Sequence, residues 1–263
     1  MIKDKRKKIA LIYEGIKTEK NLFDNLTRNF FEEQAEVMIL SLPADGNIYM
    51  LWTRLKEDDF ETDLLSVLKE MNSDVAELLR NVDMTDFSEI YLFFDYDGHN
   101  NNIPQKFKDI DVLAEMLDTF NNETEFGKLY ISYPMIESLK DISFCEQNYN
   151  TFYLPLADCA NYKEIVGGAS DYSDFRNISK EMWYAACNAS RRRASLIVLF
   201  KEKSNFSEFV KGVTQEKIYT SLKYNFIQNN NQLGVLNSVP LFLIEYYGEP
   251  FWLLLKSNSC FDE

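Results

Sequence analysis

The sequence has few of the nucleophilic and metal-binding side chains on which many enzymes depend. Its 263 residues include one histidine, His99, and four cysteines, which are Cys145, Cys159, Cys187 and Cys260. No two cysteines form a CxxC pair, so a structural zinc site is not expected. One histidine leaves little room for Ser-His or Cys-His catalysis. Any reaction of this chain is therefore expected to use carboxylates and a hard metal ion.

Long apolar runs and an excess of positive charge are also missing. The most apolar run, residues 240–255, is interrupted by Glu245, Glu249 and Pro250, so no membrane span is expected. The basic start of the chain has too few apolar residues for a signal peptide, and we expect a cytoplasmic protein. The net charge of -14 argues against non-specific coating of nucleic acid but permits contact through a local patch.

Two basic clusters, at residues 3–8 and at Arg191, Arg192 and Arg193, are candidates for such a patch. Each can equally be a set of solvated charges that flank a strand or a helix end. A GxxxxGK[ST] loop is absent, so the chain is not expected to be an ATPase.

Apolar runs alternate with amphipathic segments in the first part of the chain. Strands are expected at 8–13, 36–42, 89–94 and 128–132, with helices after the first strand, over 48–82 and near 109–121. This order predicts an α/β fold with a parallel sheet flanked by helices. We expect a core over residues 1–145, with a helical insertion at about 48–85, and a mostly helical C-terminal lobe over 146–263.

Carboxylates follow several of the expected strands. Glu14 and Gly15 follow the first strand, and the third runs through "FFDYDG" into Asp95 and Asp97. Two aspartates one residue apart repel each other unless a cation lies between them, and both can face one ion. A bound Mg²⁺ or Mn²⁺ is therefore expected, since ligands gather beyond the carboxyl ends of parallel strands. A simple Asx turn that closes the strand is the alternative.

The combination of "LIYEGIKTE" at 11–19 with "YLFFDYD" some 75 residues later resembles the signature of the Toprim fold. The Glu-Gly-x-x-Thr-Glu form is most similar to Toprim nucleases of the OLD and RloB families. A Toprim core with a helical extension also resembles the AriB-type effectors of the PARIS antiphage defence system. The resemblance covers roughly residues 8–140.

The resemblance implies a Toprim-like nuclease with a catalytic role for each of four acidic residues. Glu14 would be a metal-linked general acid or base, and Asp95 and Asp97 would be metal ligands. Glu137, which follows the fourth strand on a short helix expected to start at Pro134, would be an additional catalytic acid. Gly15, Lys17 and Glu19 would support the pocket.

The resemblance also implies substrates and partners. A Toprim chain that is short and acidic is expected to hydrolyse phosphodiester bonds rather than to reseal DNA or prime its synthesis. An AriB-like effector would act on tRNA as a defence toxin and an OLD-like enzyme on DNA, and we favour RNA. A separate protein, such as an ATPase, is expected to restrain a defence nuclease, and a homo-oligomer stays open.

Two other functions fit parts of the same sequence. "FFDYDGHN" is similar to the first motif of haloacid-dehalogenase phosphatases, in which Asp95 would be the nucleophile and Asp97 the acid/base. Ser132 and Lys140 could stand for later motifs of that family, but His99 replaces the expected threonine. The third interpretation is a non-catalytic acidic interaction module, for which no saturable magnesium site is expected.

Overall fold

The computed structural model describes residues 7–15, 17–43, 46–96, 111–143, 152–168 and 170–257. Within these ranges the chain forms two compact units. Among the described residues, the first unit takes in the chain up to Phe94 together with residues 111–129, and the second takes in Asp95, Tyr96 and the chain from Tyr130 to Ser257. A domain boundary near residue 145 stays a prediction.

A five-stranded sheet with the order β2-β1-β3-β5-β4 supports the candidate site. Its strands are β1 (Lys7–Tyr13), β2 (Ala35–Ser41), β3 (Glu89–Asp95), β4 (Asn121–Asn122) and β5 (Gly127–Ser132). β1 runs parallel to both β2 and β3, while the short β4 pairs antiparallel with β5. The α/β class with a mostly parallel sheet flanked by helices is thereby confirmed.

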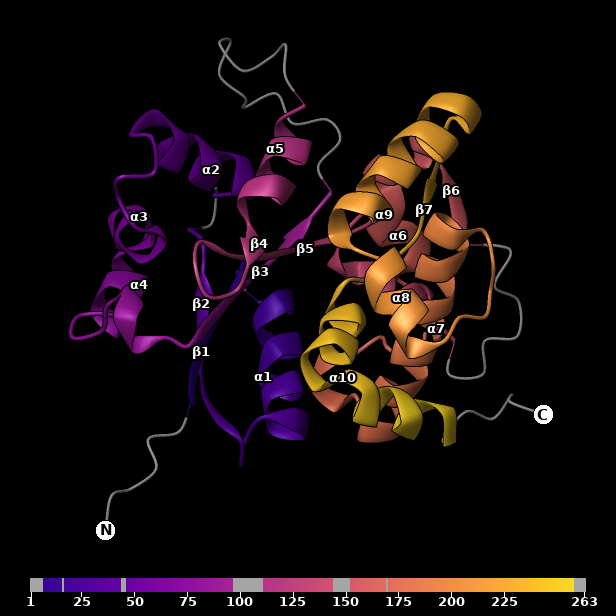
Figure 1. The fold of residues 1–263 in the computed structure, drawn as a ribbon, viewed down its shortest axis with the longest axis horizontal. Coiled ribbons are helices and arrows are strands. Elements are labelled where there is room, and N and C mark those ends of the chain that lie inside the picture. The colour runs from indigo at the N-terminus through magenta and orange to yellow at the C-terminus, as the bar shows by residue number, and fades with distance from the viewer. Residues whose placement is uncertain are drawn as a thin grey trace. The chain divides into compact units, whose positions relative to one another are not determined.

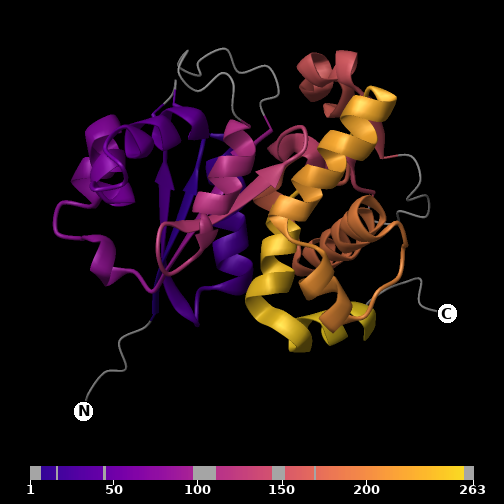
Figure 2. The ribbon, with the colours of Figure 1, turned by 45° about the horizontal axis from the view of Figure 1, so that its top comes forward.

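The sequence of β1 explains why it lies inside the sheet, between β2 and β3. Residues 9–12 are Ile, Ala, Leu and Ile, and none of the four is exposed to solvent. A strand that is apolar at consecutive positions can be buried on both of its faces. Helix α1 (Thr18–Phe30) lies on one face of this sheet, and the other face is covered by α2–α4 (Figures 1 and 2).

Helix α1 forms where the periodicity predicted it. The four apolar residues that recur on one face of the helix are all buried, and they are Leu22, Phe23, Leu26 and Phe30. Such a stripe directs one face of a surface helix into the core.

The predicted helical stretch over 48–82 is divided into three helices. They are α2 (Ile48–Glu57), α3 (Leu64–Met71) and α4 (Ser73–Leu78), and a 3-10 turn, η1 (Met84–Asp86), follows them. Asn47, Asp63 and Asn72 each accept a backbone N–H at the start of one helix, which fixes where the helix begins. The last helix of the first unit is α5 (Val112–Thr119), near the position predicted for it.

The described part of the second unit is mostly helical. Its helices are α6 (Tyr162–Val166), α7 (Lys180–Leu199), α8 (Phe206–Gly212), α9 (Gln215–Ser221), the π-helix η7 (Leu222–Gln228) and α10 (Val239–Ser257). Shorter 3-10 turns are η3 (Ile136–Asp141), η5 (Leu156–Asn161) and η6 (Phe175–Asn177), and a small antiparallel pair is formed by β6 (Tyr153–Pro155) and β7 (Gln232–Gly234).

Helix α10 consists of two segments joined by a bend at Gly248 (Figure 2). Gly248 has φ 66° and ψ -151°, a conformation that favours glycine. The first segment ends at this bend, and the chain then resumes a helix up to Ser257. Among the described helices, none has both the length and the low polarity that crossing a lipid bilayer requires.

Candidate active site at the carboxyl edge of the sheet

The register of the sheet brings the ends of β1 and β3 to one edge. Tyr13 at the end of β1 pairs with Phe93 of the parallel strand β3. Glu14 follows Tyr13 directly, and Asp95 is the last residue of β3; each is half-buried. The two carboxylates thus follow neighbouring parallel strands at the edge where α/β proteins bind their ligands.

The chain after Glu14 is shaped by a close contact with a second carboxylate. Gly15 has φ +95°, and a Cβ at this position would lie 2.3 Å from Oε2 of Glu19. Glu19 therefore packs over the Cα atom of Gly15, in the first turn of α1, where a negative charge is favoured by the helix dipole. Only glycine fits both the backbone angle and the space.

Tyr13, the last residue of β1, is buried near two carboxylates of α1. The pKa of Tyr13 is raised to about 12, first by burial and then by the charges of Asp24 and Glu19. Lys17, the positive residue expected to support the pocket, is exposed and occupies the N-cap position of α1, where its carbonyl oxygen accepts the N–H of Asn21 at 3.1 Å.

Asp95 is held by the segment that follows β5. Its Oδ1 accepts the backbone N–H of Ile136 at 2.7 Å, and the N–H of Tyr96 donates to the carbonyl oxygen of Ser132 at 2.9 Å. Ile136 is the first residue of η3 and stands directly before Glu137. The structure thus connects Asp95 with the start of the helix that carries Glu137.

Glu137 lies deeper than a helix-start carboxylate would be expected to lie. It is 5% exposed, and its Oε1 is 3.3 Å from Nζ of Lys163 on α6. Its Oε2 is buried with no hydrogen-bond partner among the described residues. The helix it belongs to is a 3-10 helix that begins at Ile136 after Met135, so the expected start at Pro134 is wrong.

Asp97 and His99 lie outside the described residues. Within the ranges that the structure does describe, no three His, Cys, Asp or Glu side chains gather closely enough to hold a metal ion. This finding does not test the predicted triad of Glu14, Asp95 and Asp97, because Asp97 is not among the described residues.

The comparisons with known proteins add no relative to this description. The chain matches no family model, no curated protein and no solved structure.

One interpretation of the arginine run at 191–193 is wrong, namely that these residues are solvated charges at a helix end. The run lies inside α7 rather than at a helix end, and Arg191, Arg192 and Arg193 are only 7%, 7% and 2% exposed. They are not solvated charges, because α7 is buried on several sides. Three successive arginines had signalled a basic cluster, but the sequence did not reveal which neighbours would cover it.

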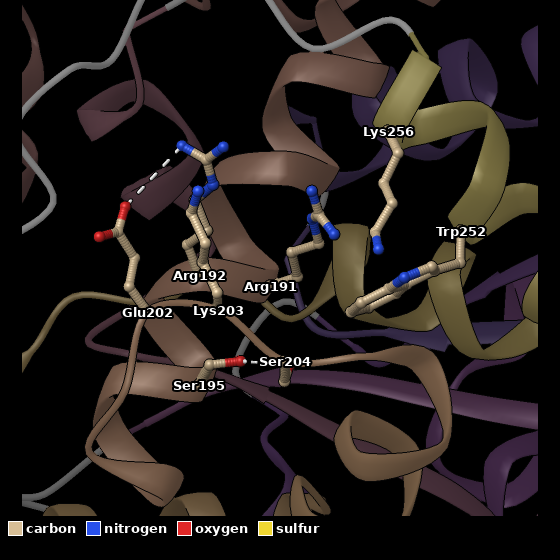
Figure 3. A pocket seen from close by; sticks show the side chains of 8 residues that line it. All are labelled: Arg191, Arg192, Ser195, Glu202, Lys203, Ser204, Trp252 and Lys256. Atoms are coloured by element: carbon tan, nitrogen blue, oxygen red, sulfur yellow. Dashed lines mark hydrogen bonds and ion pairs between the residues drawn. The ribbon is translucent and has the colours of Figure 1, made fainter. Parts of the chain in front are cut away.

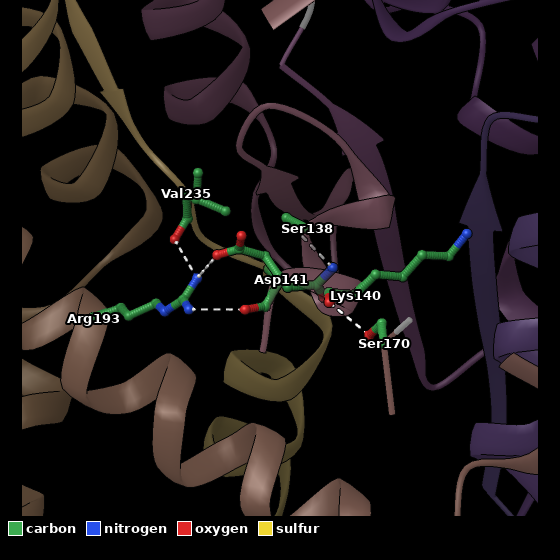
Figure 4. A network of polar contacts seen from close by, with 7 residues as sticks. Ser138, Lys140, Asp141, Ser170, Arg193 and Val235 are labelled. Atoms are coloured by element: carbon green, nitrogen blue, oxygen red, sulfur yellow. Dashed lines mark hydrogen bonds and ion pairs between the residues drawn. The ribbon is translucent and has the colours of Figure 1, made fainter. Parts of the chain in front are cut away.

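Arg193 forms a polar network with residues of two other segments (Figure 4). Its Nη1 donates to Oδ2 of Asp141 at 2.8 Å and to the carbonyl oxygen of Val235 at 3.2 Å. Its Nη2 donates to the carbonyl oxygen of Asp141 at 3.4 Å, and the guanidinium lies over the ring of Phe152. Arg193 thus joins α7 to η3 and to the segment after β7, which is a structural role.

Proposed function

We propose that this protein is a metal-dependent nuclease of the Toprim type that hydrolyses phosphodiester bonds. The observation that supports the proposal is the parallel pairing of β1 with β3, which directs Glu14 and Asp95 to one edge of the sheet. The order of strands and the Glu-Gly and Asp-x-Asp sequences at their ends agree with the resemblance to Toprim nucleases. RNA, and tRNA in particular, is the substrate that we favour over DNA.

The donor set fits a hard divalent cation. Glu14, Asp95 and Asp97 offer carboxylate oxygens, the ligands that Mg²⁺ and Mn²⁺ prefer, and a histidine or cysteine is not needed. The bond from the Ile136 N–H fixes the orientation of the Asp95 carboxylate, as a metal ligand requires. When bound, the metal supplies Lewis-acid stabilisation of the charge that develops on the phosphodiester oxygens.

The residues of the chain divide the remaining work. Asp95 and Asp97 would hold the ion. Glu14, which directly follows the neighbouring strand β1, would move the proton of the attacking water or of the leaving oxygen. Glu19 and the Gly15 turn fix the backbone that carries Glu14. Glu137 would contribute a negative charge from a fixed position, since its carboxylate is buried and paired with Lys163.

The phosphatase interpretation receives less support from the geometry. Ser132 is 1% exposed, and its hydroxyl lies 3.0 Å from the hydroxyl of Ser238 in a buried pair. The ammonium of Lys140 lies over the ring of Phe175. Neither side chain is arranged like a group that contacts a phosphate monoester, so the phosphatase stays the second candidate.

The decisive experiment combines cleavage with metal binding. Labelled tRNA and DNA are incubated with the purified protein and Mg²⁺ or Mn²⁺, and Glu14→Gln, Asp95→Asn and Asp97→Asn are compared with Glu36→Gln on the exposed surface of β2. We expect cutting, preferably of tRNA, that the first three variants lose by at least about a hundredfold. Saturable Mn²⁺ binding that Asp95→Asn and Asp97→Asn abolish is expected in the same samples.

Other outcomes separate the alternatives. Turnover of a phosphate monoester that Asp95→Asn abolishes, without cutting of nucleic acid, would identify the phosphatase. The absence of saturable Mn²⁺ binding to the folded wild type would contradict the metal site and favour the acidic interaction module. We also propose that a separate protein, such as an ATPase, restrains the nuclease in an antiviral defence system. Recovery of the tagged protein from its native cells without any stable partner would count against this.

A further inference from the structure

The second unit contains a pocket with a charge opposite to that of the whole chain. The pocket has a volume of about 340 Å³, within the range of small-molecule sites. Four cations and one carboxylate are among the described side chains that line it, together with two hydroxyls and an indole. These residues are Arg191, Arg192, Ser195, Glu202, Lys203, Ser204, Trp252 and Lys256 (Figure 3).

Three elements of the same unit form this cationic pocket. Arg191 and Ser195 are four residues apart on α7, so they lie on one face of the helix. Trp252 and Lys256 have the same spacing on the second segment of α10. Residues 202–204 contribute the third wall, in the loop between α7 and α8. Two helices therefore hold the main cationic side chains in place, which reduces the entropy lost on binding.

Both arginines of the pocket contact another residue that lines it. The guanidinium of Arg191 lies 4.7 Å from the centre of the Trp252 ring, and an aromatic face attracts a cation without neutralising it. Nη1 of Arg192 is 4.0 Å from Oε1 of Glu202, at the outer limit for an ion pair.

Polar groups that can bind an anion accompany the cations. The buried Nε1 of Trp252 has no hydrogen-bond acceptor among the described residues, and an anionic oxygen would provide one. Figure 3 shows the Lys256 side chain running back toward Trp252. The hydroxyls of Ser195 and Ser204 are 3.3 Å apart and can each rotate to donate to a ligand.

These features indicate a ligand that carries more than one negative charge and is small enough to enter a recess. Arginine matches the oxygens of a phosphate group in geometry as well as in charge. A duplex would contact protruding side chains at a surface, whereas the two arginines here are almost completely buried. We propose that the cationic pocket binds the phosphate group of a small phosphorylated molecule, a phosphate monoester or a diphosphate.

Binding to the full-length protein is measured by titration calorimetry without divalent metal, so the result does not depend on any activity at the sheet edge. Pyrophosphate and AMP are the probes, and uncharged adenosine is the control ligand. We expect saturable binding of both probes with a Kd below about 1 mM. Lys256→Gln and Lys203→Gln should weaken it about tenfold, and Glu202→Gln should tighten it about threefold.

Lys201→Gln is the matched control variant. It removes the same charge from the same loop, but Lys201 does not line the pocket and pairs with Glu208. Its Kd should stay within about a factor of two of the wild type. Melting temperatures show whether each variant is folded.

Three results would overturn the proposal. The first is a wild type that binds neither probe at millimolar concentration. The second is equal weakening in Lys256→Gln and Lys201→Gln, which would mean that the anions respond only to overall charge. The third is Lys256-dependent binding of a single-stranded oligonucleotide without a terminal phosphate, together with no binding of AMP or pyrophosphate, which would assign the pocket to a nucleic-acid strand.

Discussion

In the first unit the carboxylate of the candidate site, Glu14, directly follows the end of a strand, whereas the second unit buries three arginines inside one helix. Glu14 is half-buried directly after β1, where the backbone has turned out of the sheet. Arg191, Arg192 and Arg193 occupy the middle of α7 and meet two aromatic rings, two carboxylates and two carbonyl oxygens.

The two arrangements differ in whether the charge needs a partner from the protein itself. A carboxylate at a sheet edge keeps access to water or a metal ion, so its charge needs no partner from the protein core. A guanidinium inside a packed helical unit must find its partners there, because burying an uncompensated charge costs several kcal/mol. Stability should therefore depend more on the second arrangement than on the first, which the following variants test from the largest expected effect to the smallest.

Arg193→Met should give the largest loss of stability. It removes the cation that joins Asp141 to the carbonyl oxygen of Val235 while keeping most of the buried stem. We expect the free energy of unfolding to fall by about 2–3 kcal/mol, because the carbonyl oxygen of Val235 and the partly exposed carboxylate of Asp141 both lose their buried donor. Denaturant unfolding followed by circular dichroism measures it.

Arg176→Gln is the control for that loss. Arg176 also pairs with an aspartate, Asp174, at 2.7 Å, but the arginine is exposed. Its removal should cost less than about 0.5 kcal/mol. Equal losses in the two variants would show that burial of the ion pair does not decide its contribution.

Two substitutions of Asp95 separate its structural role from metal binding. Asp95→Ala removes the acceptor of the Ile136 N–H and should cost about 2 kcal/mol. Asp95→Asn keeps an acceptor oxygen, so its stability should stay within about 0.5 kcal/mol of the wild type while Mn²⁺ binding is lost. Unchanged Mn²⁺ binding in the asparagine variant would remove Asp95 from the metal site.

Gly15→Ala should have a moderate effect on stability. The backbone at φ +95° disfavours alanine by about 1–2 kcal/mol, and the new Cβ meets the carboxylate of Glu19. Adding Glu19→Ala should recover the part of the loss that comes from this contact. Gly168→Ala, where no atom lies within 4 Å of the new Cβ, should change the free energy of unfolding by less than about 0.5 kcal/mol.

Tyr13→Phe should show no effect near neutral pH and a small one at alkaline pH. The folded protein holds the Tyr13 proton up to a pKa of about 12, while the unfolded chain releases it near 10. The stabilisation is complete below pH 10 and is lost as the pH rises from 10 to 12, because the unfolded state then binds fewer protons. In this range the stability of Tyr13→Phe should fall less steeply in pH-dependent denaturant unfolding. Parallel curves would show that the pKa of Tyr13 is not raised.

Local sequence was sufficient for four of the five strands, but it missed β4, which begins where the helix near 109–121 was expected to end. Consecutive apolar residues predicted β1 and β3, and the stripe with Leu22 and Leu26 predicted α1, because burial follows directly from these periodicities. The Asp-x-Asp after an apolar run predicted that Asp95 would end a strand, as it does. Metal binding, cleavage and the choice of RNA stay predictions.

The neighbours of each charge were decided by tertiary structure. The sequence by itself determined that Glu14 and Asp95 follow strands, since each motif is contained in a few consecutive residues. It did not determine that Ile136 would donate to Asp95 or that Trp252 would stack on Arg191, because these contacts join residues 41 and 61 positions apart. An arginine in a helix is solvated or buried according to what packs on that face, and only the folded chain supplies those neighbours.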